Sequence, residues 1–317
     1  VNLSGWDAAT IRIEPSGHVT LRVGVSSHGQ SHETSLAQIA AEELGVAVSD
    51  VTVLHGDTAV SPYGMGTFAS RSAVAGGGAT LLAARALREK LLQIAAHLLE
   101  APVDDLELAG GRVGVRGSPE RALTLREIAQ VAYYTIFRLP PGLEPGLEVT
   151  RAYDPPLGTF SNGAQAAVVE IDPETGAVRI LRWVIVEDCG RAINPRVVAG
   201  QVHGGATQGL AGALYEEVRY DDNGQLLTAS YLDYLIPTAT EVPAFELDML
   251  HTPSPITMGG FKGMGEGGTI SPPAVVANAI RDALHPLPVR LNRLPLTPER
   301  VLEAIAQARQ APAASPP

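Results

Sequence analysis

The chain has 317 residues, 45% of them hydrophobic, which is enough for one large domain or two ordinary ones with a substantial core. Its 34 acidic residues outnumber the 23 basic ones, giving a formal net charge of −11, and no basic cluster interrupts this balance. The charge argues against a surface that follows nucleic-acid phosphates. No stretch approaches the roughly 18 apolar residues of a membrane span, so none is predicted.

The two ends and the cysteine count narrow the class further. The start, VNLSGWDAATIRIEP, has neither a secretory signal nor an initiator methionine and begins almost inside a strand. We therefore expect a cytoplasmic protein and a fragment cut from a larger polypeptide at a domain boundary. The lone Cys189 excludes an internal disulfide framework, an iron–sulfur site and a thiolate zinc site within this chain.

Periodicity predicts the following elements in chain order. The first part contains a hairpin at 11–25 and helices at 33–45, 73–99 and 124–134. The second contains a hairpin at 167–186, a helix at 196–214, a hairpin at 215–227, a strand at 246–251, and helices at 272–284 and 298–309. Strands and helices are interleaved without a regular β-α-β-α rhythm. This order favours an α+β fold of mixed β-sheets with packed helices rather than a doubly wound parallel sheet.

A proline-rich and glycine-rich stretch at 136–160 is the predicted linker. It divides the chain near residue 150, into residues 1–150 and 151–317, which we expect to form two subdomains. The end of the chain, QAPAASPP, is expected to be disordered from about residue 310.

Five loops combine glycine with polar side chains, at 24–35, 62–78, 187–195, 200–210 and 258–273. Several of them stand where a strand gives way to a helix, so their backbone N–H groups can converge on an anion. Any one such loop taken alone is more often a structural turn. Five in one chain indicate a large polyanionic ligand that is wrapped from many sides.

The sequence GMGEGG at 263–268 matches the dinucleotide fingerprint G-x-G-x-x-G. No strand is predicted directly before it, two prolines follow at the helix start, and no β-α-β unit comes after, so use as a nicotinamide site is the weaker interpretation. Within this motif Glu266 is flanked by glycines, which let a cofactor or substrate approach closely. A carboxylate buried by such a ligand can act as a general base near neutral pH.

Two smaller patterns have a plain structural interpretation. His28 and His32 are four residues apart, a spacing that can chelate zinc on a helix, but no third ligand is placed by the sequence. Exposed or capping histidines are the commoner case. Ser70 and Ser72 lack the surroundings of a nucleophile elbow, so their hydroxyls are expected to bond a ligand or a helix end.

Several motifs together resemble the xanthine dehydrogenase/aldehyde oxidase family of molybdenum hydroxylases, in the C-terminal molybdopterin-binding half of the large subunit. They are SSHGQSHETSLAQIAAEELGV, GTFASRS, FSNGAQAAVVEIDPETGAVRI, DCGRAINPRVVAGQVHGGATQGL, YLDYLIPTATEVP and KGMGEGGTISPPAVVANAI. They run from about residue 20 to 285. The forms GTFASRS and DCGRAINP lean toward large subunits similar to aerobic carbon monoxide dehydrogenase.

The resemblance implies a cofactor held by its pterin dithiolene, without protein metal ligands, as molybdopterin cytosine dinucleotide with molybdenum. The residues it implies around the cofactor are Gly29, Gln30, Ser31, His32, Thr34, Thr67, Phe68, Ala69, Ser70, Arg71, Ser72, Asp188, Cys189, Asn194, Lys262, Gly263, Met264 and Gly265. Glu266 falls on the family's catalytic glutamate, the base that deprotonates a hydroxide on the molybdenum. Water is thus the oxygen source in the oxidation of an aldehyde, an N-heterocycle or carbon monoxide.

The same resemblance implies partners. These are an N-terminal molybdenum-binding domain or chain, an iron–sulfur small subunit and an FAD-binding medium subunit, arranged as a homodimer of heterotrimers. Ser31 departs from the pattern, since the family usually has a second glycine there, and the family's N-terminal molybdenum domain is absent from this sequence. Two alternatives stay open: a non-catalytic assembly or interaction domain, and an NAD-dependent dehydrogenase.

Overall fold

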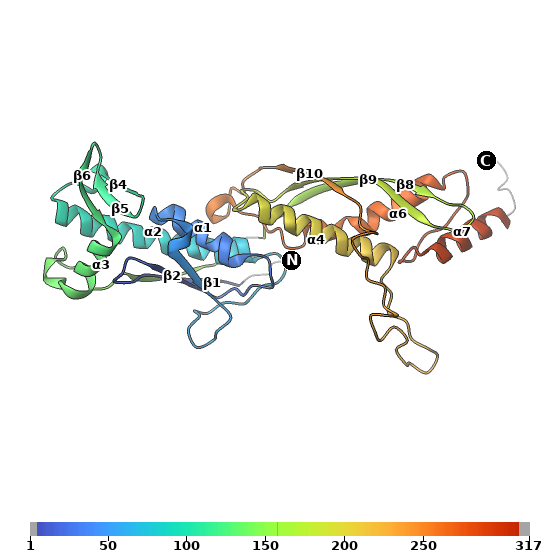
Figure 1. Ribbon diagram of the computed structural model, residues 1–317, viewed down its shortest axis with the longest axis horizontal. Coiled ribbons are helices and arrows are strands. Elements are labelled where there is room, and N and C mark those ends of the chain that lie inside the picture. The colour runs from blue at the N-terminus through green and yellow to red at the C-terminus, as the bar shows by residue number, and fades with distance from the viewer. Residues whose placement is uncertain (1–4, 157, 311–317) are drawn as a thin grey trace. The chain divides into compact units, whose positions relative to one another are not determined.

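Residues 5–156 and 158–310 are described by a computed structural model, in which the chain forms two units (Figure 1). Unit 1 contains the residues up to Phe160 together with Cys189–Val197 and Thr252–Gly263. Unit 2 contains Ser161–Asp188, Val198–His251 and the residues from Met264 onward. The tail expected to be disordered from about residue 310 lies almost wholly outside the described residues. Each unit is described by itself below.

The main sheet of unit 1 has the strand order β3-β2-β1-β7. Its strands are β1 (Asp7–Ile13), β2 (Val19–Val23), β3 (Val51–Leu54) and β7 (Glu148–Tyr153). β1 pairs antiparallel with both β2 and β7, whereas β2 pairs parallel with β3. The hairpin predicted at 11–25 is confirmed. The stretch predicted as a linker contains β7, so the boundary expected near residue 150 falls inside a strand of this sheet.

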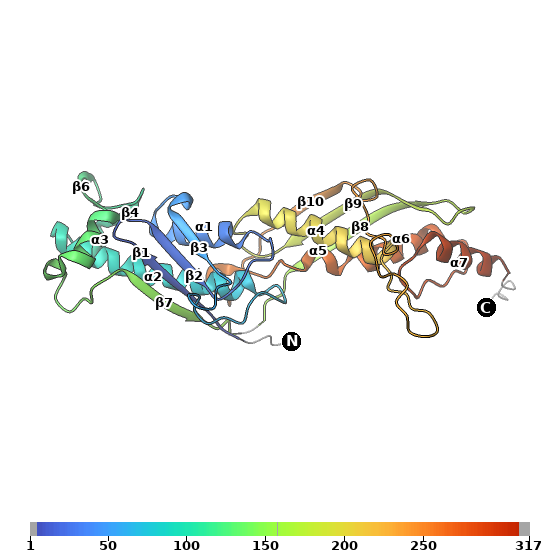
Figure 2. The ribbon, with the colours of Figure 1, turned by 60° about the horizontal axis from the view of Figure 1, so that its bottom comes forward.

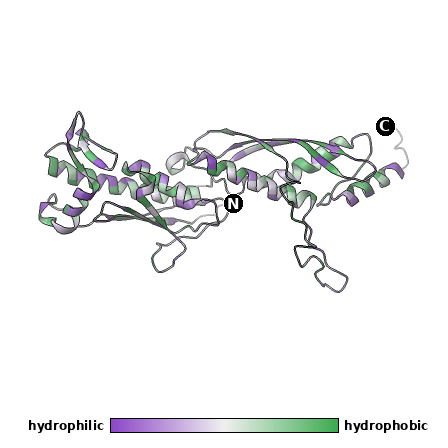
Figure 3. Ribbon diagram, in the orientation of Figure 1, coloured by the Kyte–Doolittle hydropathy of each residue, from purple (hydrophilic) through white to green (hydrophobic). Residues whose placement is uncertain are grey.

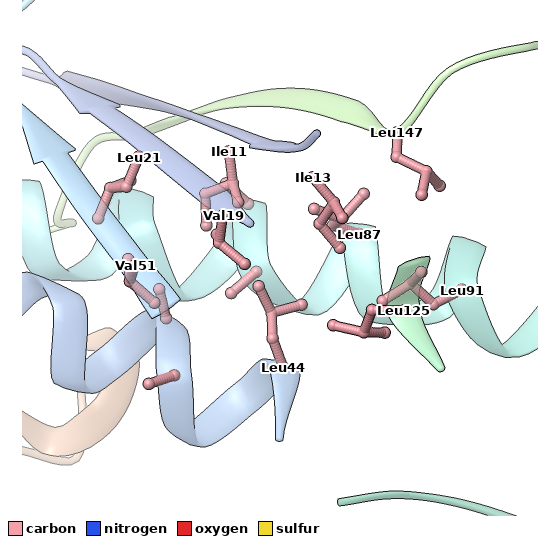
Figure 4. Packing of buried hydrophobic residues seen from close by; sticks show 14 of the residues in the cluster. Ile11, Ile13, Val19, Leu21, Leu44, Val51, Leu87, Leu91, Leu125 and Leu147 are labelled. Carbon is pink, nitrogen blue, oxygen red and sulfur yellow. The ribbon is translucent and has the colours of Figure 1, made fainter. Parts of the chain in front are cut away.

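Two helices cover this sheet, α1 (His32–Leu44) and α2 (Ser72–Leu99). Ile11, Ile13 and Leu21 of the strands belong to one cluster with Leu87 and Leu91 of α2, and all five side chains are fully buried (Figure 4). β1, β2 and much of α2 carry hydrophobic residues in Figure 3, as a buried layer requires. This layer is the principal core of unit 1.

The glycines at the start of α2 allow the backbone of this helix to lie directly against the side chains of Val25 and Tyr153. A β-carbon on Gly76 would stand 2.9 Å from Cγ2 of Val25, and one on Gly78 would stand 2.3 Å from the Tyr153 ring. Such distances leave no room for a side chain, so the helix and the sheet meet here through glycine.

A smaller sheet with the order β4-β5-β6 and a third helix complete unit 1. The elements are β4 (Leu106–Ala109), β5 (Arg112–Val115), β6 (Ser118–Thr124) and α3 (Leu125–Tyr134). α3 begins with a capping box, in which Thr124 Oγ1 accepts from the Glu127 backbone N–H at 3.1 Å. The Glu127 carboxylate in turn accepts from the Thr124 N–H at 2.7 Å.

Unit 2 is built on a sheet of order β10-β9-β8, with α4 and α6 lying along the same face of it (Figures 1 and 2). Its elements are β8 (Asn162–Ile171), β9 (Val178–Asp188), α4 (Pro195–Leu214), β10 (Phe245–Leu250), α5 (Gly267–Ile270), α6 (Pro272–Ala283) and α7 (Pro298–Gln310). β8 and β9 form the antiparallel hairpin predicted at 167–186. β9 and β10 are parallel and are connected through α4. The prediction of mixed sheets with packed helices is confirmed.

The inward and outward residues of β9 alternate. Trp183, Ile185 and Glu187 are buried, whereas Arg182 is exposed and makes a bidentate ion pair with Glu246 of β10 at 2.7 Å. One face of this sheet is therefore covered by the helices, while the other carries ion pairs between solvent-exposed side chains.

The hairpin predicted at 215–227 is present only as a short antiparallel turn, in which the Leu227 N–H donates to the Arg219 carbonyl at 2.8 Å and the Asp221 N–H to the Gln225 carbonyl at 3.0 Å. Tyr220 and Leu226 form one isolated antiparallel bridge, and no strand is assigned around it. The Asp221 side chain does make a turn, accepting from the N–H groups of Asn223 and Gln225 at 2.9 and 2.8 Å. The segment leaves the end of α4 as an extended loop (Figure 1), and without a neighbouring strand one bridge does not propagate into a ladder.

Within residues 5–156 and 158–310, no helix combines the length and the apolar character needed to cross a membrane.

α7 begins as the sequence predicted, because the Arg300 N–H donates to Thr297 Oγ1 at 3.4 Å and Pro298 occupies the first helical position.

Candidate functional site

Two of the glycine-rich loops meet in unit 1, before α1 and before α2. Thr67 connects them, since its hydroxyl donates to the Ser26 carbonyl at 2.6 Å and accepts from the Ser26 N–H at 3.2 Å. Ser72 Oγ donates to the same hydroxyl at 3.1 Å. Gly24 and Gly64 touch backbone to backbone, because a β-carbon on either would stand 2.5–2.6 Å from the other loop. The loops that carry the predicted groups Gly29–Thr34 and Thr67–Ser72 are thus joined at Ser26 and Thr67.

The backbone of these two loops is strained. Ser31, Ala69 and Ser70 have φ values of 62°, 48° and 57°, and among the described residues Glu100 is the one other non-glycine residue with positive φ. Left-handed backbone costs a non-glycine residue on the order of 1–3 kcal/mol and clusters at functional sites. The position of Ser31, where the resemblance expects glycine, is therefore one that glycine would occupy at lower cost.

His32 begins α1 inside this strained region. Its side chain is 7% exposed and its Nδ1 has no hydrogen-bond partner among the described residues. Burial lowers the pKa of His32, so the neutral imidazole is favoured. Gly29 and Gly66, which have φ values of 101° and 87°, face open space where a β-carbon would stand. A buried polar atom without a described partner, in joined loops whose glycines leave open space, fits the binding of a polar ligand.

The other residues of the first loop form hydrogen bonds with neighbouring groups of unit 1. The Gln30 side chain accepts from the His28 N–H, and the Thr34 N–H donates to the Ser31 carbonyl at 3.2 Å. The exposed Glu33 carboxylate binds His55 Nε2 at 2.8 Å. The pKa of Glu33 is lowered, chiefly by its own backbone N–H and then by His55. No group of three or more His, Cys, Asp or Glu that could hold a metal ion occurs among the described residues.

Arg71 is one of the implied cofactor residues, but its side chain is paired with other groups of the protein. Its guanidinium forms an ion pair with Asp7 of β1 and donates to the carbonyls of Gly66 and Gly5 at 3.0 and 2.7 Å. It also lies over the ring of the exposed Phe68, 5.4 Å from the centroid. Arg71 therefore shapes the loop that carries Ala69 and Ser70.

Four more predicted residues, Cys189, Asn194, Lys262 and Gly263, lie in unit 1. The Lys262 N–H donates to the carbonyl of the buried Cys189 at 3.0 Å. A β-carbon on Gly263 would stand 2.3 Å from the Ser70 carbonyl oxygen, so Gly263 and Ser70 are in direct contact. Asn194 Nδ2 donates to Gln38 Oε1 of α1 at 2.9 Å.

Glu266 lies in unit 2 with the predicted residues Asp188, Met264 and Gly265. It is exposed and immediately precedes the single turn α5. Helix α4 supports this segment from one side: Gln201 Nε2 donates to the Gly265 carbonyl at 3.4 Å, and a β-carbon on Gly205 would stand 2.9 Å from the Thr269 nitrogen. Met264 is buried, and its methyl group fills the space beside Gly267. Asp188 ends β9 and is 5% exposed.

The end of the β8–β9 pair supports the same segment from another side. Gln165 Nε2 donates to the Gly268 carbonyl at 3.2 Å, and Trp183 Nε1 donates to Gln165 Oε1 at 3.2 Å. Glu187 lies among them, 3% exposed. Sequence reasoning missed Gln165, Glu187, Gln201 and Gly205. For Glu187 a signal was present, because a carboxylate occupies an inward position of an alternating strand.

The surroundings of GMGEGG differ from those of a dinucleotide loop. The residues before it form a short turn, Met258–Gly260, and a single bridge between Phe261 and Gly190. The helix after Glu266 has four residues. A dinucleotide fingerprint needs a strand directly before its first glycine and a full helix after it, so this geometry does not favour the dehydrogenase alternative.

The sequence of the chain is similar to a known family and to several known proteins. Residues 2–243 match the model of the molybdopterin cofactor-binding domain family. The chain is 44% identical over 298 residues to the nicotine 6-hydroxylase large subunit of Paenarthrobacter nicotinovorans, covering 94% of this chain and 36% of that protein. It is 44% identical over 283 residues to the carbon monoxide dehydrogenase large chain of Afipia carboxidovorans, covering 89% and 35%.

The fold of the chain is also similar to solved structures. Quinoline 2-oxidoreductase from Pseudomonas putida 86 superposes with a TM-score of 0.90 at 46% identity, covering 96% of this chain and 38% of that one. A Cu,Mo carbon monoxide dehydrogenase gives 0.89 at 42% identity, with the same two shares. The chain thus spans little more than a third of the length of these proteins. It belongs to the molybdopterin cofactor-binding domain family, as found in the large subunits of molybdenum hydroxylases related to carbon monoxide dehydrogenase and xanthine dehydrogenase.

Proposed function

We propose that this chain is the C-terminal, cofactor-binding part of a molybdenum hydroxylase large subunit, in which the loops of unit 1 bind molybdopterin and Glu266 of unit 2 acts as general base. The proposed cofactor form is molybdopterin cytosine dinucleotide. The proposed reaction is the water-dependent oxidation of an aldehyde, an N-heterocycle or carbon monoxide. The family membership and the geometry of the loops support this assignment.

The observation that carries the proposal is the strain concentrated in the two joined loops of unit 1. Ser31, Ala69 and Ser70 hold left-handed backbone, and the buried Nδ1 of His32, the residue after Ser31, has no hydrogen-bond partner within residues 5–156 and 158–310. Strained loops with unsatisfied polar atoms are retained where a ligand repays their cost. The open glycines Gly29 and Gly66 give a pterin or a phosphate group room to approach the backbone.

When bound, the molybdenum cofactor supplies the redox chemistry and activates water. The residues of this chain then bind and orient it and move a proton. His32, the amide of Gln30 and the hydroxyl of Ser31 offer hydrogen bonds to its polar atoms, while the Thr67 hydroxyl, already bonded to Ser26 and Ser72, holds the two loops together. Glu266 accepts the proton of the activated water. Its neighbours Gly265 and Gly267 present no side chains that would obstruct the carboxylate.

The proposed partners are those of large subunits in this family. The relatives include proteins named as a large subunit, a large chain and subunit gamma of a dehydrogenase complex. For the present protein we propose an N-terminal molybdenum-binding domain or chain, an iron–sulfur subunit and an FAD subunit, paired into a homodimer of heterotrimers. Electrons leaving the molybdenum need such carriers to reach an acceptor.

The experiment is the substitution Glu266→Gln in the complete enzyme, assembled with its partner subunits. Loss of a general base is expected to lower kcat by roughly 10²-fold or more, while molybdenum and cytosine nucleotide, measured by metal analysis and nucleotide release, remain at wild-type levels. The matched control is Glu241→Gln, on the exposed loop of the same unit, for which unchanged kcat is expected. Full turnover by Glu266→Gln would refute the assignment of the base.

Metal analysis also separates this function from the non-catalytic alternative. An assembly or interaction domain with the same fold would leave the complete complex without molybdenum. A complex that contains molybdenum and loses it on Ser70→Val, which places a branched residue at left-handed backbone, would support cofactor binding by these loops.

A further inference from the structure

The carboxyl group of Glu187 is buried in unit 2 and has no role in the function proposed above. Its side chain is 3% exposed at an inward position near the end of β9, and Oε1 has no hydrogen-bond partner among the described residues. Burying a carboxyl group without full pairing costs free energy, so such groups are uncommon unless they serve a purpose.

Two glycines make the space that this carboxyl group occupies. Gly163 pairs with Glu187 across the β8–β9 ladder, and a β-carbon on Gly163 would stand 2.4 Å from Oε2. A β-carbon on Gly267 would stand 3.4 Å from the same oxygen. The carboxyl group therefore lies between the end of the sheet and the residue that directly follows Glu266.

Gln165 connects Glu187 to the next residue of that segment. Its amide faces the Glu187 carboxyl group closely enough to lower the pKa of that group, and it donates to the Gly268 carbonyl at 3.2 Å. Trp183, fully buried, fixes the other end of this amide by donating to Gln165 Oε1 at 3.2 Å. Contacts from the rigid sheet thus reach both residues after Glu266.

We propose that Glu187 is a positioning residue, whose buried carboxyl group, together with Gln165, sets the backbone of Gly267 and Gly268 and thereby the direction of the Glu266 side chain. The inference rests on the proposed role of Glu266. Glu187 acts through Glu266 and touches neither substrate nor cofactor. A glycine-flanked catalytic loop is intrinsically mobile, and contact with a sheet end reduces the number of directions its carboxylate samples.

Burial favours the neutral form of this carboxyl group and raises its pKa, while the hydrogen bond from Gln165 opposes the shift. Glutamine has the same shape as a neutral glutamic acid and keeps an oxygen that accepts from Gln165. Methionine has a similar volume but offers no such acceptor. Glu187→Met and Glu187→Gln therefore separate positioning by hydrogen bonding from filling of the core.

The test uses the complete enzyme with molybdenum content, KM and kcat as readouts. We expect Glu187→Met to lower kcat by roughly 10- to 100-fold, the scale of a misplaced catalytic group, with KM and molybdenum content within about twofold of wild type. Glu187→Gln should restore kcat to within about threefold of wild type. The control is Glu170→Gln, on the exposed face of the same sheet, which should change nothing.

A second arm distinguishes positioning from a general loss of structure. Combined with Glu266→Gln, Glu187→Met should lower kcat no further, because a residue that acts through Glu266 has nothing left to position. Wild-type kcat in Glu187→Met, a Gln variant as impaired as the Met variant, or additive losses in the double variant would each overturn the inference. Full activity of Glu266→Gln alone would instead refute the proposed function.

Discussion

Arg71 and Asp7 form a buried ion pair in unit 1, where Arg71 is 7% exposed and Asp7 0%. The pair connects the first strand to the strained loop before α2, and the Asp7 carboxylate also accepts from the Met65 N–H at 2.9 Å. Burial raises the pKa of Asp7, while Arg71 and this N–H oppose the shift. The loop around Ala69 and Ser70 thus rests on an ion pair made by Arg71, a residue that the sequence motif alone would assign to ligand binding.

The first prediction follows from this pair. Arg71→Met should lower the free energy of unfolding by roughly 3–5 kcal/mol, because it leaves a buried carboxylate without its partner. Asp7→Asn combined with Arg71→Met should recover part of that loss. Denaturant unfolding of the complete subunit measures both. If Arg71→Met lost molybdenum while keeping wild-type stability, Arg71 would be a cofactor ligand rather than a structural residue.

The second prediction compares two adjacent glycines of α4. Gly205→Ala should displace the segment after Glu266, since the added carbon meets the backbone of Gly268 and Thr269 at 2.9–3.0 Å. We expect a loss of about 1–3 kcal/mol in stability together with lower kcat. Gly204→Ala faces open space on the same helix and should stabilise it by about 0.5–1 kcal/mol. Equal effects of the two substitutions would contradict the close packing of α4 on this segment.

The third prediction concerns the left-handed backbone at Ser31. Ser31→Gly should be neutral or stabilising by up to about 1 kcal/mol, because relief of strain is partly offset by the greater freedom of glycine in the unfolded chain. Ser31→Val should destabilise, since a β-branched residue adopts positive φ at high cost. Thermal unfolding of both variants checks this. The carbonyl of Ser31 that accepts from Ser35 at 3.0 Å is unaffected by either change.

The fourth prediction is a pH dependence that originates at Glu187. Its folded pKa is raised above the ordinary value of 4.5, so the folded state binds the proton more tightly than the unfolded state. Its contribution to stability is complete below pH 4.5 and is lost as the pH rises through the folded pKa. Glu187→Gln removes this decline. The unfolding midpoint of the variant relative to wild type should therefore increase from pH 4.5 upward, and a constant difference would count against the buried carboxyl group.

Much of the fold could be predicted from periodicity. All six helices of ten or more residues within residues 5–156 and 158–310 begin within one residue of their predicted positions, because their apolar spacing and end signals are local properties. The hairpin at 215–227 is a turn with one bridge rather than two strands, because alternation extends into a strand only where a further neighbour exists to pair with it. β7 was taken for linker because its flanking prolines concealed a strand that pairs with β1, 140 residues away at Thr10 and Thr150.

The sequence by itself determined the family and the glycine-rich loops and singled out Glu266 as the candidate base, because these depend on residue identity and order. Only the tertiary structure decided which groups support them. Arg71 is held by Asp7, 64 residues away, and the segment of Glu266 rests on Gln165, Glu187 and Gly205, which come from a strand pair and a helix. Burial, register and the distance at which two backbones meet are properties of long-range packing, and no local pattern encodes them.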